Sequence, residues 1–524
     1  MATPAEKLAQ SLEALEALQK RGLVAIRSTE LSRTHRERLL KGGFLQLVMK
    51  GWYIPSRPDE ATGESTAWYA SYWQFCAAYL NARFGTDWTL SPEQSLLLHA
   101  GDRTVPRQLL VRVARNARNK VTQLPWGTSL LDILASLPEA RDVIDFDGLR
   151  VFSLPVALVS SAPRIYVQNP TDVRAALAMV RDASDILPRL LEGGHSTVAG
   201  RIAGAFRNIG RARIAHEIVE TMRAAGYDTR EKDPFEAPAP LLLHTRQASP
   251  YVNRIRLMWH AMRGPVIARF PETPGLPSDT KTYLKQVQDA YVSDAYHSLS
   301  IEGYRVDRAL IERVRTGHWN PDVNEDDRNR RNALAARGYW QAFQAVQDSV
   351  RKVLEGQNAG SVADEDHRIW YRELFAPSVA AGLLRPADLA GYRTDQVHIR
   401  RSMHVPPNRE AVRDLMPAFF ELLRDETESS VRTVLGHFVF VYIHPYMDGN
   451  GRIGRFLMNV MLASGGYPWS VIPVGGRNAY MAALEKASVD QDIAPFTDFL
   501  ARIVQARLAG GAAPRPGDDQ LNIA

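Results

Sequence analysis

The twelve residues from 444 to 455, HPYMDGNGRIGR, constrain the structure of this chain more than any other segment. Pro445 ends the apolar stretch before them, and the Gly-Asn-Gly run at 449–451 tolerates positive φ angles. Such a loop can turn successive backbone N–H groups into one concave surface that binds anions. A helix that begins at Gly451 would add the positive end of its dipole to the same surface. The segment therefore predicts a phosphate-binding loop followed by a helix.

Charged side chains follow this loop at a helical spacing. On the expected helix, Arg452 and Arg455 lie away from the apolar face, so that two guanidinium groups would stand beside the loop. Asp448 offers a hard oxygen ligand for Mg²⁺, which usually bridges phosphates. His444, at the entrance of the loop, could accept a hydroxyl proton near pH 7 as a neutral imidazole. Together these groups predict phosphoryl or nucleotidyl transfer, in which positioning and charge neutralisation supply most of the catalysis.

The whole segment resembles the motif of the Fic (filamentation induced by cAMP) family, His-Pro-Phe-x-Asp/Glu-Gly-Asn-Gly-Arg-x-x-Arg. It departs from that motif at Tyr446, which keeps an aromatic ring and adds a hydroxyl group that needs a partner. The resemblance covers about residues 250 to 505. It implies a mainly α chain with an all-helical Fic core and a short β-hairpin flap. It also implies an enzyme that transfers AMP from ATP to a Ser, Thr or Tyr hydroxyl of a target protein, with Mg²⁺ and release of pyrophosphate.

By this resemblance, each charged or loop residue of the motif has a role. His444 would be the base that deprotonates the target hydroxyl, and Asp448 would bind Mg²⁺. The residues that would hold the phosphates of the nucleotide are Gly449, Asn450 and Gly451, with Arg452 on the β-phosphate side and Arg455 at the γ-phosphate.

A later stretch resembles the part of the family that lies near the adenine. It contains Arg477, Asn478 and Tyr480, and the ring of Tyr480 could stack on the base. A tyrosine packed in the core of the domain is the alternative interpretation. His437, on the apolar stretch before the motif, is interpreted as a core histidine rather than a ligand.

Residues 298–303, SLSIEG, fit the inhibitory pattern Ser/Thr-x-x-x-Glu-Gly/Asn of Fic proteins that carry an N-terminal inhibitory helix. The residues that carry the pattern are Ser298, Glu302 and Gly303. Taken alone, the pattern could also be the end of a helix that is capped by the glycine. The resemblance implies that Glu302 pairs with Arg455, occupies the arginine that the γ-phosphate needs and holds ATP in a nonproductive pose.

The segment 397–405 alternates apolar and polar residues, which predicts a strand or hairpin that ends at a Pro-Pro pair. It resembles the flap of the Fic family. Through Val397, Ile399 and Met403, an extended target segment could pair with its edge and present a hydroxyl to His444. An ordinary exposed hairpin is the alternative.

The N-terminal region has a different character. Helical periodicity at 6–20, a short basic helix that ends near Lys41 and a hairpin pattern at 44–54 follow the order of a winged helix-turn-helix, which we place at residues 1–58. Residues 20–50 contain eight basic and two acidic residues, a charge of +6 that equals the net charge of the chain. Such clustering predicts DNA binding through residues 20–50, because Lys and Arg neutralise a phosphate backbone. A solvated basic face or a protein-interaction module is the alternative.

The N-terminal half also resembles abortive-infection-type antitoxins and regulators, through residues 43–54 and 91–101. Further along, three prolines between 234 and 240 predict a linker, and a Gly- and Pro-rich end predicts a disordered tail. The expected domains are thus a mixed α/β and helical antitoxin-like region at 59–230, a linker at 231–249, the Fic domain with its inhibitory helix at 250–507 and the tail at 508–524.

Composition excludes several other classes of protein. A single cysteine, Cys76, rules out a disulfide framework and a multi-cysteine zinc site. The longest apolar runs, such as residues 438–443, fall far short of the ~20 residues that a membrane-spanning helix needs. The N-terminus lacks the apolar stretch of a secretory signal, so that we expect a cytoplasmic protein without a membrane partner.

The first functional hypothesis is an autoinhibited protein adenylyltransferase, with itself as a second candidate substrate besides the target protein. The second is a DNA-binding transcriptional regulator whose Fic domain senses nucleotide. A third keeps the Fic fold but transfers a different group, or removes AMP. The sequence leaves open the identity of the target protein and the oligomeric state, a homo-oligomer included.

Overall fold

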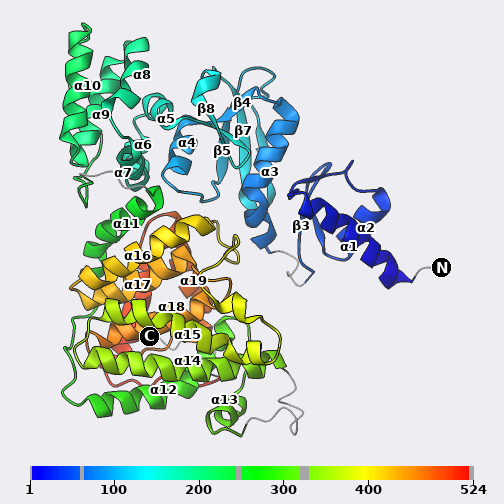
Figure 1. Ribbon diagram of the computed structural model, residues 1–524, viewed down its shortest axis with the longest axis vertical. Helices are drawn as coiled ribbons and strands as arrows, with labels where there is room; N and C mark the ends of the chain where they lie inside the picture. Colours follow the sequence, from blue (N-terminus) through cyan, green and yellow to red (C-terminus); the bar gives the residue numbers. More distant parts are fainter. Residues whose placement is uncertain (1–2, 59–63, 244–248, 319–329, 518–524) are drawn as a thin grey trace. The chain divides into compact units, whose positions relative to one another are not determined.

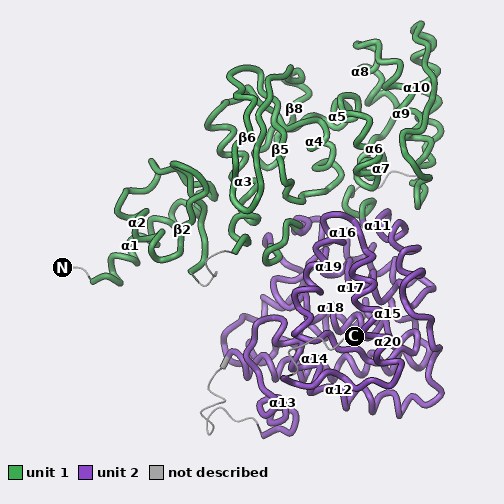
Figure 2. The backbone as a smooth tube through the Cα atoms, turned by 180° about the vertical axis from the view of Figure 1, so that it is seen from behind, with its two compact units in different colours: residues 1–254, 398–405 green, residues 255–397, 406–524 purple. Residues whose placement is uncertain are grey.

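The computed structural model describes residues 3–58, 64–243, 249–318 and 330–517 of the chain. The chain forms two compact units, which are coloured separately in Figure 2. The N-terminal unit consists of residues 1–254 together with the short segment 398–405, and the C-terminal unit consists of residues 255–397 and 406–524. The chain therefore passes between the units three times, after residue 254 and on both sides of the 398–405 segment.

The N-terminal unit begins with a small module of helices and strands. Thr3 caps its first helix in a capping box with Glu6, and Ser32 caps the second helix. Its strands form an antiparallel sheet in the order β1-β3-β2, and a small apolar core that includes Leu15 and Leu39 joins the sheet to both helices. The order of elements matches the predicted helix, basic helix and hairpin. These elements are α1 (Pro4–Lys20), β1 (Ile26–Arg27), α2 (Arg33–Lys41), β2 (Leu45–Met49) and β3 (Trp52–Pro55), of which Figure 1 labels α1, α2 and β3.

The second part of the N-terminal unit is a mixed α/β region around one aromatic helix, α3 (Thr66–Phe84). This helix buries Trp68, Tyr72 and Phe75, and Cys76 is buried among them, as a small apolar residue would be. A four-stranded sheet in the order β4-β5-β7-β6 shares the same hydrophobic core, and its strands β5 and β7 run parallel. The strands are β4 (Trp88–Leu90), β5 (Gln108–Val113), β6 (Val121–Gln123) and β7 (Ser129–Leu134), followed by a separate hairpin of β8 (Val143–Phe146) and β9 (Leu149–Phe152).

Seven further helices complete the described part of the N-terminal unit up to residue 224. They are α4 (Pro92–His99), α5 (Leu154–Ser160), α6 (Ile165–Gln168), α7 (Pro170–Met179), α8 (Leu187–Glu192), α9 (Ser196–Asn208) and α10 (Ala212–Ala224). The pair α9 and α10 is strongly amphipathic and buries Phe206 and Ile218 on its inner face.

The predicted linker at 231–249 is packed where the structure describes it. The N–H of Lys232 donates to the carbonyl of Gly200 on α9 (3.1 Å), and Phe235 is buried beneath the guanidinium of Arg174. The close approach requires glycine on α9, because a Cβ at Gly200 would lie 1.9 Å from the carbonyl oxygen of Arg230. The prolines prevent a helix here, but they allow an extended chain to lie along one. Residues 244–248 lie outside the described residues.

The C-terminal unit consists of helices and loops, without a β-strand among its described residues. Among the described helices of the chain, none combines the length and the apolar character that crossing a bilayer requires. The helices are α11 (Pro250–Ile267), whose first five residues belong to the N-terminal unit, α12 (Thr280–Ile301), α13 (Arg308–Arg315), α14 (Arg330–Leu354), α15 (Ala359–Ala380), α16 (Arg409–Asp425), α17 (Ser429–Ile443), α18 (Asn450–Ala463), α19 (Arg477–Val489) and α20 (Ala494–Leu508), with the short 3₁₀-helices η5 (Pro386–Leu389) and η6 (Val474–Gly476).

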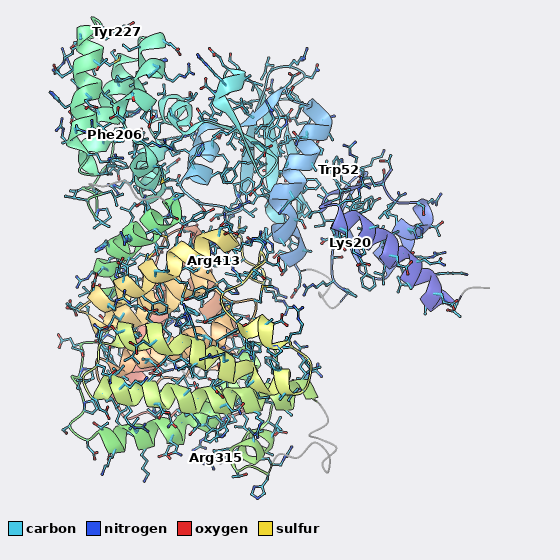
Figure 3. All side chains as sticks on the ribbon, viewed as in Figure 1. Lys20, Trp52, Phe206, Tyr227, Arg315 and Arg413 are labelled. Atoms are coloured by element: carbon cyan, nitrogen blue, oxygen red, sulfur yellow. The ribbon has the colours of Figure 1, made fainter. Side chains whose placement is uncertain are left out.

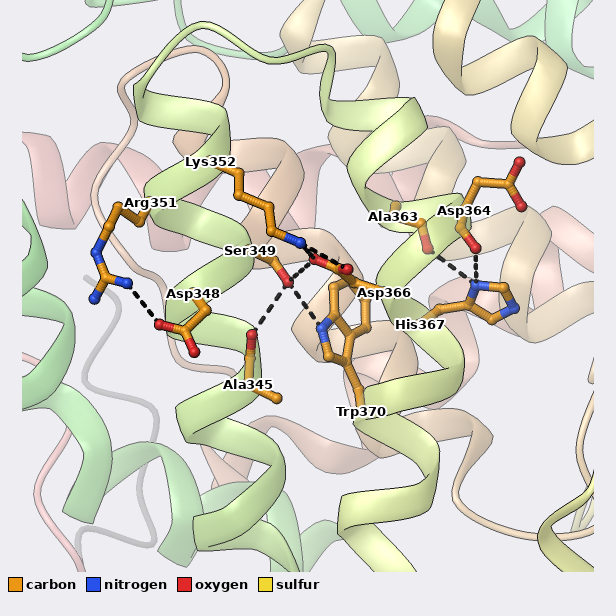
Figure 4. Close-up of polar contacts among 10 residues, drawn as sticks. All are labelled: Ala345, Asp348, Ser349, Arg351, Lys352, Ala363, Asp364, Asp366, His367 and Trp370. Atoms are coloured by element: carbon orange, nitrogen blue, oxygen red, sulfur yellow. Dashed lines mark hydrogen bonds and ion pairs between the residues drawn. The ribbon is translucent and has the colours of Figure 1, made fainter.

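A buried carboxylate joins the two long helices α14 and α15, as Figure 4 shows. Asp366 on α15 accepts hydrogen bonds from Ser349 Oγ (2.7 Å) and Lys352 Nζ (2.8 Å) on α14. Trp370 Nε1, one turn further along α15, donates to the same Ser349 hydroxyl (3.0 Å). Because a buried charge that loses its partner costs about 3–5 kcal/mol, these bonds fix the register of α15 against α14.

The predicted disordered tail begins in contact with the C-terminal unit. Ser293 Oγ on α12 donates to the carbonyl of Pro514 (2.6 Å), and Arg507 Nη1 donates to the carbonyl of Gly511 (2.6 Å). These bonds place the first part of the tail along the helices. Residues 518–524 lie outside the described residues.

The predicted hairpin at 397–405 is not formed, and residues 398–405 belong to the N-terminal unit. The carbonyl of Met403 accepts the N–H of Val105 (2.9 Å), and the N–H of Arg401 donates to Thr66 Oγ1 (3.1 Å). Val405 joins the hydrophobic core around α3. Backbone groups that would pair across a hairpin are therefore bound to α3 and to the chain before β5 instead.

A buried carboxylate also fastens this segment. The side chain of Glu64 is 2% exposed, and it accepts hydrogen bonds from Arg400 Nε (2.9 Å) and Arg401 Nη2 (2.9 Å). Hydrogen bonding to Arg400, together with the charge of both arginines, holds the pKa of Glu64 below its usual value. The 398–405 segment is thus tied to the N-terminal unit by main-chain bonds, by apolar packing and by charge.

We expect Glu64→Gln to loosen the 398–405 segment, because a neutral amide cannot balance two guanidinium groups. Hydrogen bonds to charged groups contribute about 1.5–3 kcal/mol, so that amide exchange at Arg401 and His404 should accelerate roughly tenfold or more. Hydrogen exchange measured by mass spectrometry on the full chain tests this. Glu37→Gln, which breaks an exposed pair with Arg33, is the matched control. Equal exchange in the wild type and in Glu64→Gln would show that the ion pairs do not hold the segment.

Candidate active site

The motif loop lies between α17 and α18, and its two ends adopt left-handed backbone conformations. His444, directly after α17, has φ 54°, and Gly449, directly before α18, has φ 82°. Asn450 closes the loop from inside: its Oδ1 accepts the N–H of Tyr446 (2.9 Å) and its Nδ2 donates to the carbonyl of Tyr446 (2.8 Å). The side chain of Asn450 therefore shapes the loop, and the main-chain N–H groups at the start of α18 remain for an anion.

Arg393 holds the loop from outside, and the sequence analysis missed it. Its backbone N–H donates to the carbonyl of Pro445 (2.9 Å), and its Nε donates to the carbonyl of His444 (2.8 Å). Its Nη2 also donates to the carbonyl of Pro407. Burial lowers the pKa of Arg393 to about 10, which still leaves it charged near pH 7. Its position, 51 residues before the motif, carries no local pattern that could have marked it.

His444 has one ring nitrogen bonded and one available. Nδ1 lies 3.2 Å from the carbonyl oxygen of Val441, a pure acceptor, so that we assign the ring proton to Nδ1. Nε2 then carries the lone pair that can accept a hydroxyl proton. Burial, with a contribution from the charge of Arg393, lowers the pKa of His444 to about 4. The imidazole is therefore neutral at pH 7, as a general base must be.

The predicted pair of Glu302 and Arg455 is present. Glu302, at the end of α12, accepts a hydrogen bond from Arg455 Nη2 (2.7 Å), while Arg455 Nε donates to Ser298 Oγ (2.8 Å). Burial alone would raise the pKa of Glu302, but Arg455 and Arg452 outweigh it and hold that pKa below its usual value. Gly303 follows with φ 86° and ends the helix, so that the inhibitory pattern and the predicted helix end are the same structure.

The carboxylate of Glu302 lies directly over the loop. A Cβ added at Gly451 would meet Glu302 Oε1 at 2.3 Å and Arg455 Nη1 at 3.2 Å. Glycine is therefore required at 451 for an anionic oxygen to come this close to the start of α18. Glu302 places its oxygen where the loop was predicted to hold a phosphate.

A chain of hydrogen bonds continues behind Arg455. The hydroxyl of Ser298, which accepts from Arg455, bonds to the hydroxyl of Tyr339 on α14. Tyr339 in turn donates to Asp294 Oδ2 (2.7 Å), one turn before Ser298 on α12. Burial raises the pKa of Asp294 to about 6, so that this carboxyl is mostly ionised at pH 7. Neither Tyr339 nor Asp294 was predicted to belong to the site.

Arg452 and Asp448 lie together beside the loop. The guanidinium of Arg452 contacts two aromatic rings, with its Cζ 5.2 Å from the ring centroid of Tyr304 and 5.1 Å from that of Phe375. Its Nη2 donates to Asp448 Oδ2 (3.3 Å). The Asp448 side chain is 65% exposed. Two buried guanidine nitrogens, Nε of Arg452 and Nη1 of Arg455, have no acceptor among the described residues. The arrangement therefore provides main-chain and guanidinium donors that suit a polyphosphate.

Tyr480 does not match the predicted role of stacking on a base. Its ring is buried against His437 and Phe496, and its hydroxyl lies 2.7 Å from His437 Nε2. A base would have no open ring face to stack on, and the packed alternative describes this tyrosine. His437 is confirmed as a core histidine, and burial lowers its pKa to about 4. Arg477 binds the end of α12, because its Nε donates to the carbonyl of Ile301 (2.8 Å).

The predicted flap residues do not share one element. Val397 is buried and belongs to the C-terminal unit, whereas Ile399 and Met403 belong to the N-terminal unit. The side chain of Met403 packs against the core around α3. Of the three, Ile399 and the backbone around it remain partly exposed.

Comparison with known proteins relates one part of the chain to a family. The sequence model of the Fic/DOC family matches residues 365–462. The protein adenylyltransferase Fic of Drosophila willistoni is 30% identical over 225 residues, which cover 42% of this chain and 41% of that protein. The protein of the same name from Nematostella vectensis is 28% identical over 238 residues, 44% of this chain and 51% of that protein. The chain thus spans about half the length, or less, of these curated relatives.

Two solved structures are similar to parts of the chain. Fic-1 from C. elegans has 20% sequence identity and a TM-score of 0.35, over 65% of this chain and 96% of that one. A Fic domain containing signaling protein from Bacteroides thetaiotaomicron has 16% identity and a TM-score of 0.32, over 50% and 98% of the two chains. The family match itself contains the motif loop, Arg452 and Arg455. Residues 365–462 of this chain are therefore similar in sequence to the Fic/DOC family.

Proposed function

We propose that this protein is an adenylyltransferase that transfers AMP from ATP to a Ser, Thr or Tyr hydroxyl of a target protein, and that Glu302 inhibits it. The observation that supports this most is the free Nε2 of a neutral His444 beside a loop with two arginines. Buried N–H groups of Arg452 and Arg455 lack an acceptor among the described residues, which suits a phosphate ligand. The relatives named protein adenylyltransferase Fic favour the same reaction.

In the proposed reaction, Nε2 of His444 takes the proton of the target hydroxyl, and the oxygen attacks the α-phosphorus of ATP. A P–O bond to the target forms, the bond from the α-phosphorus to the bridging oxygen breaks, and pyrophosphate leaves with that electron pair. The start of α18, Arg452 and Arg455 would hold the β- and γ-phosphates and so fix the α-phosphorus in line with the hydroxyl. Arg393 keeps the base in place through the carbonyl of His444.

Asp448 fits the role of a Mg²⁺ ligand in this proposal. Mg²⁺ commonly binds one or two carboxylates together with substrate phosphates and waters. Among the described residues, no group of three or more potential side-chain metal ligands occurs. When bound, Mg²⁺ would neutralise charge on the phosphates. Arg452 Nη2 donates to the same Asp448 carboxylate, so that this guanidinium also lies close to the proposed phosphates.

Inhibition in this proposal is competition for one guanidinium. Glu302 bonds Arg455 Nη2 and lies over Gly451, so that a γ-phosphate at the same arginine would meet the carboxylate. ATP would then bind displaced from the in-line position. A misplacement of about 1 Å can cost ~10²-fold in rate, so that inhibition of at least that order follows from geometry.

Target docking through the predicted flap is not part of this proposal. Met403 has its carbonyl bound to Val105 and its side chain packed, so that it cannot pair with a target strand.

We expect Glu302→Gly to raise label transfer from α-labelled ATP about 10²-fold or more, because Arg455 becomes available to the γ-phosphate. γ-labelled ATP should leave no label on protein, since pyrophosphate departs. In the Glu302→Gly background, His444→Ala should reduce transfer by about 10²–10⁴-fold, and Arg455→Ala should also reduce it strongly. The measurement is label incorporation into the enzyme and into added lysate proteins.

Glu302→Gln is the matched control for this series, because it keeps the size of the side chain and removes its charge. It should relieve inhibition in part. Retention of the γ label would instead assign phosphate transfer. Equal transfer by wild type and Glu302→Gly would remove Glu302 from the mechanism.

His444 should be neutral at pH values where an ordinary histidine is charged. With the pKa lowered to about 4, the ring stays more than about 90% neutral at pH 5.5, whereas a pKa near 6.5 would leave it about 90% protonated. Since a base acts in its neutral form, His444 should cause no fall in kcat/KM for ATP in Glu302→Gly from pH 7 to 5.5, and a fall with a midpoint near 6 would report the protonation of Asp294 instead. NMR titration of ring resonances, assigned with His444→Gln, checks the pKa directly. A midpoint above 6 would contradict the expectation.

A second candidate function is DNA binding by the first module of the N-terminal unit. The basic helix α2 beside the hairpin β2–β3 favours it, but several basic side chains of this module are used internally. Arg36 donates to the carbonyl of Ser28 (2.7 Å), and the guanidinium of Arg27 lies over the ring of Trp52. Figure 3 labels Trp52, as well as Lys20 at the end of α1. The exposed basic side chains without an ion pair among the described residues include Arg21, Lys41 and Lys50.

We expect the triple variant Arg21→Gln, Lys41→Gln and Lys50→Gln to weaken binding of duplex DNA at low salt. Each lost phosphate contact lowers the slope of log affinity against log salt by about 0.9, so that the slope should fall by up to about 3. Gel shifts of the full chain across a salt series measure this. Arg33→Gln, whose side chain is paired with Glu37, is the matched control and should have a smaller effect. The absence of any complex with wild-type protein at low salt would reject this function.

A further inference from the structure

A cleft of about 600 Å³ borders the motif loop within the C-terminal unit. One side is formed by α15 and the other by η5 and the residues after it. Its apolar wall includes Ile369, Ala376, Val379 and Leu389. The motif loop reaches the cleft through Tyr446, which is two residues from His444 and two from Asp448. The bonds of Asp366 to α14, shown in Figure 4, fix the helix that forms the wall.

Tyr446 contributes a hydroxyl that has no partner. The residue is 1% exposed and its ring stacks on Tyr371, with ring centroids 3.8 Å apart. Its hydroxyl oxygen is buried without a hydrogen-bond partner among the described residues. A buried hydroxyl without a partner costs stability, and a phenylalanine would fill the same space without that cost. The hydroxyl at this position is therefore best explained by a ligand in the cleft.

The other polar groups of the cleft are mainly cationic. Arg368 and Arg372 lie one turn apart on α15, and both act electrostatically on Tyr446. Arg368 lies over the ring of Tyr392, with its Cζ 5.4 Å from the ring centroid, whereas Arg372 forms no ion pair or hydrogen bond in the part of the chain that the structure describes. Glu373 is the one carboxylate among the described lining residues. Two arginines and a phenol donor facing one carboxylate favour an anionic acceptor with more than one oxygen.

We propose that this cleft binds an acidic side chain of the target protein, whose carboxylate is held by Arg372 and the Tyr446 hydroxyl while its aliphatic stem lies on the apolar wall. The cleft thus sets which hydroxyl is modified, since the loop that carries His444 also carries Tyr446. This inference rests on the proposed function for the identity of its ligand. The recognition of a carboxylate does not depend on transfer, so that the two can be tested separately.

Hexanoate and hexanamide are the probes for recognition, because they share a stem and differ in the carboxylate. In ligand-observed NMR titrations of the full chain, hexanoate should bind at least about fivefold more tightly than hexanamide, the difference that a charge-assisted bidentate contact supplies. Arg372→Gln and Tyr446→Phe should each reduce that preference. Arg385→Gln, near the cleft but paired with Asp388 and outside its lining, is the matched control and should keep it. Equal binding of the two probes, or a preference unchanged by Arg372→Gln, overturns the proposal.

A second arm separates the two proposals. The second experiment measures the rate of AMP transfer by the Glu302→Gly chain to pairs of threonine peptides. The two peptides of a pair differ only in carrying Glu or Gln at one position beside the threonine, and each flanking position is tested in turn. One Glu position should raise kcat/KM by at least about fivefold, and the further change Arg372→Gln should abolish that preference. Transfer to Glu and Gln peptides at equal rates overturns the role in target choice. If no label is transferred to peptides or proteins while hexanoate is still preferred, the proposed function fails and the carboxylate site stands.

Discussion

One guanidinium, that of Arg455, joins the inhibitory helix to the motif loop. It is buried, and a buried charge that loses its partner is strongly destabilised. Glu302 and Ser298 on α12 accept from its Nη2 and Nε, while its Nη1 lies near Gly451, where a phosphate is expected. The site can therefore exchange one anion for another, but it cannot readily be left without either. Under the proposed function, this ion pair would be a suitable inhibitory contact, because it stabilises the fold without nucleotide and would be replaced by a phosphate when nucleotide binds.

A second constraint comes from the path of the chain. Residues 398–405 are held by Glu64 and Val105 in the N-terminal unit, yet both of their neighbours in sequence belong to the C-terminal unit. Arg393, just before the segment, binds both Pro407, just after it, and the carbonyl of His444. Within the C-terminal unit, one side chain thereby joins the chain on both sides of the segment to the motif loop.

The sequence predicted well what is encoded locally. The motif predicted the loop, and α18 begins at Asn450, one residue before the expected Gly451. The family pattern also predicted the contact of Glu302 with Arg455 across 153 residues. The prediction from sequence failed where a distant part of the chain determines the local structure. The alternating pattern at 397–405 suggested a hairpin, but its backbone groups form hydrogen bonds with α3 and Val105 instead. The role of Arg393 was missed for the same reason, since nothing near it in sequence indicates which carbonyls it binds.

The hydrogen bonds behind Arg455 explain why a hydroxyl suits position 298. Arg455 can only donate, and the ionised carboxylate of Asp294 can only accept. Between them, Ser298 accepts from Arg455 and donates onward, and Tyr339 accepts from Ser298 and donates to Asp294. The two ends of this chain fix the direction of every bond in it, so that the Ser298 oxygen always presents a lone pair to Arg455. In the proposed exchange of Glu302 for a phosphate, Asp294 would leave a negative charge near Arg455 and so keep the arginine in place.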